Sequence, residues 1–135
     1  MIRPSLLLLV PALLMAAPTP KVLTPAMVVE RQLEALNAHD LEGIMALFSE
    51  DAEASDLPVG APALRGKAGL RERYATLLKG SPEFHVSAAA QLVSGAFVVQ
   101  RERLKGLPNA NVPAEVVMVY QVKSSKIIRM WALRE

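Results

Sequence analysis

VVERQLEALNAHDLEGIMALFSEDAEASDLPVG, residues Val28 to Gly60, is the stretch that decides the fold. Up to Phe48 its apolar residues recur every three or four positions, which predicts two amphipathic helices. From Ala52 the period changes to two, so Ala52, Ala54 and Asp56 share one face of a predicted short strand. If the small alanines face the interior of the domain, Asp56 faces it too, at the wall of an apolar layer.

Capping residues mark where the helices begin. Thr24 followed by Pro25 is typical of an N-cap and a first helical position. Asp40 is placed to cap the second helix in the same way. A loop rich in proline and glycine follows, from Leu57 to Gly66, and a third helix is predicted from Lys67 to Lys79.

The second half of the chain has the alternating pattern of strands. The predicted two-residue turns are Ser94-Gly95 and Ser124-Ser125. Helices first and antiparallel strands later predict an α+β domain, with three N-terminal helices packed on one face of a curved antiparallel sheet. The four predicted long strands are Phe84–Val93, Ala96–Leu104, Ala114–Val122 and Lys126–Arg134.

The composition is that of one folded domain. Of 135 residues, 52% are hydrophobic and 21% are charged, which is enough for an apolar core. The net charge is only +2 and the basic residues are interleaved with acidic ones, so we expect no nucleic-acid partner. The sequence has no cysteine, which excludes disulfides and cysteine-bound zinc. His39 and His85 lack ligand spacing, so we predict neither a metal site nor a cofactor.

Residues 1–17 have the parts of a secretory signal peptide. Arg3 precedes an apolar run from Leu6 to Met15, and two alanines follow. The run is shorter than the roughly 20 residues that span a bilayer. We predict an exported protein, periplasmic or secreted and not held in the membrane after cleavage, with a linker at residues 18–25 and a domain at residues 26–135. The alternative is an uncleaved apolar tail or a buried extra helix.

The order of elements from about Val28 to Leu133 resembles the cone-shaped fold of the nuclear transport factor 2-like superfamily. Within that superfamily the chain is most similar to the branch that holds SnoaL-like polyketide cyclases and ketosteroid isomerases. The segments that carry the resemblance are EALNAHDLEGIMALFSEDA (residues 34–52), AGLRERYATLL (residues 68–78) and KIIRMWAL (residues 126–133).

The resemblance implies a set of site residues. Asp56 matches the position of the catalytic base of the isomerases, which work with an aspartate base and two hydrogen-bond donors to the developing enolate oxygen. Gln32 stands in place of the donor tyrosine, and the second donor acid falls near Val117 or Met118, neither of which can donate a hydrogen bond. The oxyanion donors of the isomerases are therefore not retained. Tyr74 matches a pocket tyrosine, and Met130 is implied to face the pocket, so Gln32, Tyr74, Met118 and Met130 are the expected substrate-binding residues.

Each candidate also has a structural interpretation. Asp56 is equally suited to the turn before Leu57-Pro58. Gln32 is also explained as a helix glutamine satisfied by backbone or water, and Tyr74 as a core tyrosine with a polar tip. Strand alternation puts Trp131 on one face with Ile127, and the resemblance implies that this is the outer face of the sheet.

Three functions follow from these patterns. The first is a cofactor-free enzyme that moves a proton on a small hydrophobic carbonyl compound, as an isomerase, cyclase or dehydratase does, with Asp56 as the base. The second is a binding protein for an apolar molecule that performs no reaction. The third is a protein-interaction module that uses the exposed sheet face. A homodimer formed through the sheet is implied by the resemblance.

Overall fold

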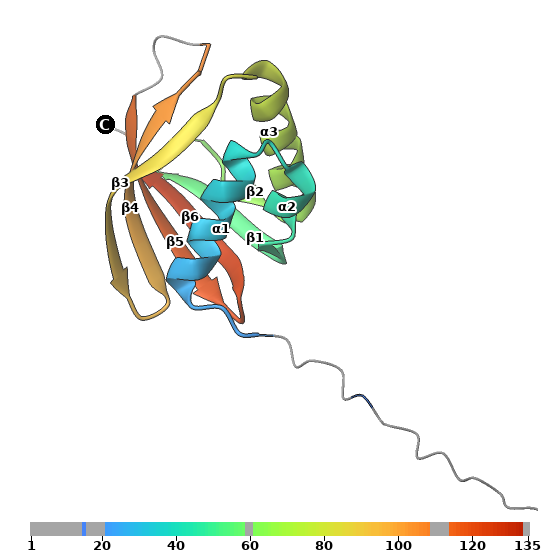
Figure 1. The fold of residues 1–135 in the computed structure, drawn as a ribbon, viewed down its shortest axis with the longest axis vertical. Helices are drawn as coiled ribbons and strands as arrows, with labels where there is room; N and C mark the ends of the chain where they lie inside the picture. The colour runs from blue at the N-terminus through green and yellow to red at the C-terminus, as the bar shows by residue number, and fades with distance from the viewer. Residues whose placement is uncertain (1–14, 16–20, 59–60, 109–113, 134–135) are drawn as a thin grey trace, which may run out of the picture.

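The structure, a computed structural model, describes residues 15, 21–58, 61–108 and 114–133. The helices in these residues are α1 (Pro25–Asn37), α2 (Leu41–Met45) and α3 (Lys67–Gly80). They lie on one side of a strongly bent sheet, and α1 packs across strands β3 to β6 (Figure 1). Apart from Met15, the predicted leader lies outside the described residues, as does the first part of the predicted linker.

The sheet has the strand order β2-β1-β6-β5-β4-β3. The predicted α+β fold is confirmed, but the sheet is mixed and not wholly antiparallel, because β1 runs parallel to β6. Parallel neighbours need a long connection, and here the intervening elements of the domain supply it. Four strands begin and end within one residue of the predicted ones, whereas β2 lies in the predicted loop. The strands are β1 (Phe48–Leu57), β2 (Leu64–Arg65), β3 (His85–Ser94), β4 (Phe97–Lys105), β5 (Glu115–Lys123) and β6 (Lys126–Leu133).

The first two helices begin at the predicted caps. The Thr24 hydroxyl accepts a hydrogen bond from the Met27 amide at 3.3 Å, and the Asp40 carboxylate accepts one from the Gly43 amide at 3.0 Å. These contacts satisfy backbone donors that have no partner within the first turn of a helix. The apolar side of α1 is buried against the sheet, and Gln32, only 1% exposed, is buried with it.

Phe48 corrects the predicted length of the second helix. The spacing placed Phe48 on the last turn of that helix, but α2 ends at Met45 and Phe48 is the first residue of β1, opposite Ile127 of β6. The Ile127 amide donates to the Leu47 carbonyl at 2.8 Å, which starts the pairing of the two strands. Phe48 is 1% exposed, so its side chain reaches the core as expected, although from a strand.

A bulge in the β5–β6 pair corrects the predicted faces of the last strand. Ile127 lies opposite Val122, but Arg129 lies opposite Gln121, so Ile128 is an extra residue. The alternation therefore shifts, and Ile127 is fully buried instead of sharing the outer face with Trp131. Beyond the bulge, Met130 and Ala132 are buried on the helix side of the sheet.

The outer face of the sheet carries an apolar row across four strands. Leu92 lies opposite Val99, Val99 opposite Val119, and Val119 opposite Trp131. Leu92 is 66% exposed, and Trp131 is half-buried. This row is available to a partner, and the homodimer expected from the resemblance stays a prediction.

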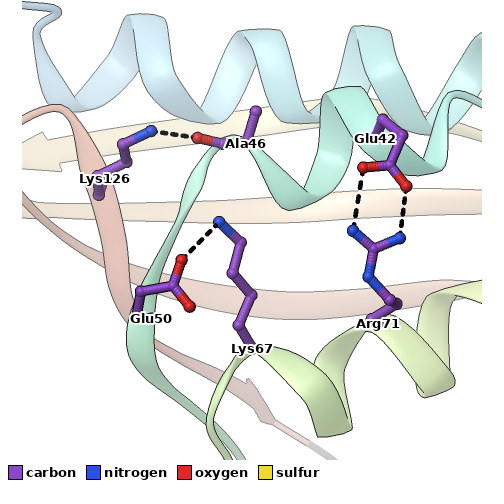
Figure 2. Close-up of polar contacts among 6 residues, drawn as sticks. All are labelled: Glu42, Ala46, Glu50, Lys67, Arg71 and Lys126. Carbon is purple, nitrogen blue, oxygen red and sulfur yellow. Dashed lines mark hydrogen bonds and ion pairs between the residues drawn. The ribbon is translucent and has the colours of Figure 1, made fainter.

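Ion pairs hold α3 against its neighbours (Figure 2). Both terminal nitrogens of the Arg71 guanidinium donate to the Glu42 carboxylate of α2, at 2.5 and 3.0 Å, and Lys67 donates to Glu50 of β1 at 3.4 Å. The two carboxylates are largely exposed, and ion pairs at exposed sites add little to stability. The pairs link α3 to α2 and β1, and α3 is the helix that places Tyr74 in the interior of the domain.

Candidate functional site

A cavity of about 670 Å³ lies between α1, α3 and the inner face of the sheet. Its size suits a small organic ligand, and most of its wall is apolar. Exposed residues such as Arg73, Arg101 and Glu115 belong to its lining, so the cavity opens to solvent. The residues that line it are Gln32, Leu36, Arg73, Tyr74, Leu77, Phe84, Val86, Arg101, Glu102, Leu104, Leu107, Glu115, Val116, Val117, Met118, Tyr120, Met130, Ala132 and Leu133.

One cluster of hydrogen-bonded side chains in the wall links α1, α3 and β6. The Gln32 amide nitrogen donates to the Tyr74 hydroxyl at 3.0 Å, and that hydroxyl donates to the Met130 sulfur at 3.6 Å. Burial raises the pKa of Tyr74 well above its usual range, so the phenol stays neutral at every ordinary pH. Within the described residues the buried Gln32 Oε1 atom has no hydrogen-bond partner. An acceptor of this kind is ready for a donor on a ligand.

A second cluster, of two hydrogen-bonded side chains, joins β4 and β5. The Tyr120 hydroxyl donates to Glu102 Oε1 at 2.6 Å, and the two residues are 2% and 5% exposed. Burial raises the pKa of Glu102 to about 7, although the hydrogen bond from Tyr120 acts in the opposite direction. No ion pair to a described residue offsets the charge of this carboxylate. Near neutral pH both the acid and the carboxylate are therefore populated, as proton transfer requires.

The two clusters lie close enough for each to affect pKa values in the other. The charge of Glu102 helps to raise the pKa of Tyr74, and the Tyr74 hydroxyl also acts on the pKa of Tyr120. One end of a ligand could thus meet a neutral phenol and an amide while a nearby atom meets a carboxyl group.

The sequence-predicted residues are only partly brought together. Gln32, Tyr74, Met118 and Met130 all line the cavity, and their contact with a substrate stays a prediction. Asp56 does not belong to the lining, although the adjacent Ala132, its partner across β1 and β6, does.

The surroundings of Asp56 agree with its predicted strand face. Ala52 and Ala54, the two residues that share its parity, are 0% and 2% exposed, so this face of β1 points to the core. Asp56 itself is half-buried near the end of the strand. Its role as a base stays a prediction.

Glu102 and Tyr120 were missed by the sequence analysis, although strand alternation could have found them. Glu102 has the same parity in β4 as the buried Val98, and Tyr120 the same parity in β5 as the buried Val122. The flanking Arg101 and Arg103 gave the segment the look of a solvated charged strand. Parity, not composition, was the usable signal.

In the described part of the chain, no three His, Cys, Asp or Glu side chains are grouped so as to hold a metal ion. The ring of His39 contacts the Phe84 carbonyl oxygen through Nε2 at 3.0 Å. No helix among the described residues has the length and apolar character needed to cross a membrane.

Comparison with known proteins gives a family and a set of related folds. The sequence model of the SnoaL-like domain family matches residues 29–130 of the chain. A cystatin-fold protein from Novosphingobium aromaticivorans superposes with a TM-score of 0.72 at 22% identity, over 83% of this chain and 99% of that one. A SnoaL-like protein of unknown function from Burkholderia thailandensis superposes with a TM-score of 0.66 at 22% identity, over 83% and 97% of the two chains.

An enzyme also shares the fold. SalBIII, an epoxide hydrolase/cyclase-like enzyme with a role in pyran ring formation in the polyether salinomycin, superposes with a TM-score of 0.69. The identity is 20%, and the match covers 81% of this chain and 88% of SalBIII. At such identities the likeness concerns the fold alone.

Proposed function

Because the chain belongs to the SnoaL-like domain family, we propose that it is an exported protein that binds one small, mostly apolar molecule and moves a proton on it. The reaction is of the isomerase, cyclase or dehydratase type and needs no cofactor. The ligand carries a carbonyl or related oxygen, because the few polar groups of the cavity can hydrogen-bond such an atom.

One observation carries this function. A cavity of about 670 Å³ has an apolar wall in which Gln32, Tyr74, Glu102 and Tyr120 are the buried polar residues of its lining. Buried polar side chains cost free energy unless they are paired or used, and the Gln32 Oε1 atom has no partner in the described residues. The hydroxyl group of an enol, which a ketone forms when a proton moves from carbon to oxygen, can supply that missing partner.

Gln32 and Tyr74 orient the substrate in this proposal. An amide is a weak donor to a developing oxyanion, and the loss of one strong donor costs about a hundred- to a thousand-fold in rate. We therefore expect a substrate with a relatively acidic carbon–hydrogen bond, because the enolate of such a substrate needs less stabilisation by the protein. The resemblance assigns the base to Asp56, which lies on the core side of β1 beside the lining residue Ala132.

The test uses 2-tetralone, a small apolar ketone with acidic hydrogens next to its carbonyl group. Binding is measured by calorimetry, and exchange of those hydrogens for deuterium is followed by proton NMR in D2O. The proposed function predicts saturable exchange that is faster than in buffer alone. Met118→Trp, which puts a larger side chain into the cavity, should weaken both binding and exchange.

A binding protein without chemistry is the second candidate. The lack of a strong donor at Gln32 favours it, because ligand capture needs orientation but no oxyanion stabilisation. Saturable binding of 2-tetralone with no exchange in the wild-type protein would select this function. 2-Naphthol, an aromatic alcohol that resembles the enol of 2-tetralone, is a second probe of binding. If the cavity binds neither compound, the apolar row of the outer sheet face becomes the candidate site, as an interaction surface.

A further inference from the structure

We propose that Glu102, held by Tyr120, is the residue that exchanges the proton with the ligand in the cavity, in place of the predicted Asp56. This inference rests on the proposed function and assigns its central chemical role. It also indicates the substrate class, which is a neutral ketone with an acidic carbon–hydrogen bond beside the carbonyl group.

The position of Glu102 supports this assignment. Its side chain points to the helix side of β4, it is 5% exposed, and it belongs to the lining of the cavity, whereas Asp56 does not. The Tyr120 hydroxyl engages Oε1 at 2.6 Å, and no other described residue hydrogen-bonds this carboxyl group. Oε2 therefore remains for a ligand.

The hydrogen bond also fixes the direction in which Tyr120 acts. A phenol that donates to a carboxylate stabilises the charged form, and the pKa of Glu102 is lower with this bond than burial alone would make it. Burial raises the pKa of Tyr120 itself well above its usual value, so Tyr120 keeps its proton and acts as a donor. Tyr120 is thus a positioning residue, and Glu102 is the group that titrates.

The charge of Glu102 restricts the part of the ligand that lies beside it. The ionised Glu102 carboxylate has no cationic partner in the described residues, so an anionic group bound beside it would be repelled. The part of the substrate that reaches Glu102 is therefore neutral. A ketone carbonyl satisfies this condition at Glu102, whereas the cationic Arg73 and Arg101 lie at the exposed rim of the cavity.

The proposed reaction is a proton transfer from carbon to Glu102 and back to carbon, and it needs no other reactant. The Glu102 carboxylate removes the proton beside the carbonyl group, and the electron pair of the broken carbon–hydrogen bond forms the carbon–carbon double bond of an enolate. The carbonyl π electrons move to the oxygen, which Tyr74 or Gln32 can hydrogen-bond. The carboxylic acid then returns a proton to carbon, either at the same atom or at the end of a conjugated double bond.

The experiment compares Glu102→Gln, Asp56→Asn and Tyr120→Phe in the 2-tetralone exchange assay across a pH series. Glu102→Gln keeps the size of the side chain and its acceptor for Tyr120, and it should lower the exchange rate by about a hundred- to ten-thousand-fold. Wild-type exchange should rise with pH through about 7, the pKa of Glu102. Tyr120→Phe should keep exchange at high pH but move this rise to higher pH, a change that simple loss of structure would not produce.

Glu72→Gln removes one exposed carboxylate of α3 and serves as the control, with an unchanged profile. Wild-type rates in Glu102→Gln, or a rise through pH 7 that persists in it, would overturn the role of Glu102. Loss of exchange in Asp56→Asn, with exchange retained in Glu102→Gln, would return the role to Asp56 and leave the proposed function intact. No exchange by the wild-type protein would refute proton transfer itself, and with it this role.

Discussion

Replacement of Glu102 by glutamine should also stabilise the fold, and should do so only above a defined pH. Burial raises the pKa of Glu102 from its ordinary value of 4.5 to about 7. Between these two pH values the folded chain binds a proton at Glu102 that the unfolded chain has released. The free energy of unfolding therefore falls as the pH rises through this window.

The size of the effect follows from the two pKa values. Each pKa unit corresponds to about 1.4 kcal/mol, so the rise from 4.5 to about 7 amounts to roughly 3 kcal/mol. This cost of holding an ionised Glu102 in the fold is complete above about pH 7 and absent below about pH 4.5. Glutamine cannot ionise, and it can still accept the hydrogen bond of Tyr120, so the variant avoids the cost.

Urea unfolding of the wild-type protein and Glu102→Gln, at pH values between about 4.5 and 8.5, measures this difference. The free energy of unfolding of the variant should gain on that of the wild type by roughly 3 kcal/mol over the series. Glu72→Gln, an exposed change of the same kind, should follow the wild type. Parallel curves for the wild type and Glu102→Gln would refute the reasoning, because they would show that Glu102 ionises as easily in the fold as in the unfolded chain.

Three further variants test the cavity and the outer face. Gln32→Leu should change the free energy of unfolding by no more than about 1 kcal/mol, because one polar atom of Gln32 has no partner in the described residues, and should weaken 2-tetralone binding about tenfold in calorimetry. Met118→Trp, which narrows the cavity, should weaken that binding while the melting temperature, measured by circular dichroism, moves by a few degrees at most; unchanged binding would place the ligand elsewhere. Trp131→Glu should convert a wild-type dimer to a monomer in analytical ultracentrifugation, and a wild-type protein that already sediments as a monomer would contradict dimerisation through the sheet.

The sequence predicted the elements well where a local pattern is decisive. The caps Thr24 and Asp40 and the long alternating segments gave the helix starts and four strands to within one residue. Phe48 was assigned to a helix because its side chain reaches the core from either a helix or a strand. Only the pairing with β6, more than half the chain away, separates the two.

The site was less predictable for two physical reasons. The bulge at Ile128 depends on how β5 and β6 pair, so simple alternation placed Ile127 on the wrong face. The pair of Glu102 and Tyr120 depends on the register of β4 against β5, which no single strand specifies. The resemblance directed attention to Asp56 and Gln32, whereas the cavity wall also contains a carboxyl group that the resemblance did not imply.

The place of β6 in the sheet has a consequence for synthesis of the protein. β6 lies between β1 and β5, so it alone joins the early β1–β2 pair to the later antiparallel strands. During translation β1 leaves the ribosome long before β6, its parallel neighbour, exists, and an unpaired strand edge is prone to aggregation. The two parts of the sheet can join only after β6 has emerged. Folding should therefore be slow, as is common when segments far apart in the sequence must meet. A nascent chain halted before Lys126 should remain dependent on chaperones.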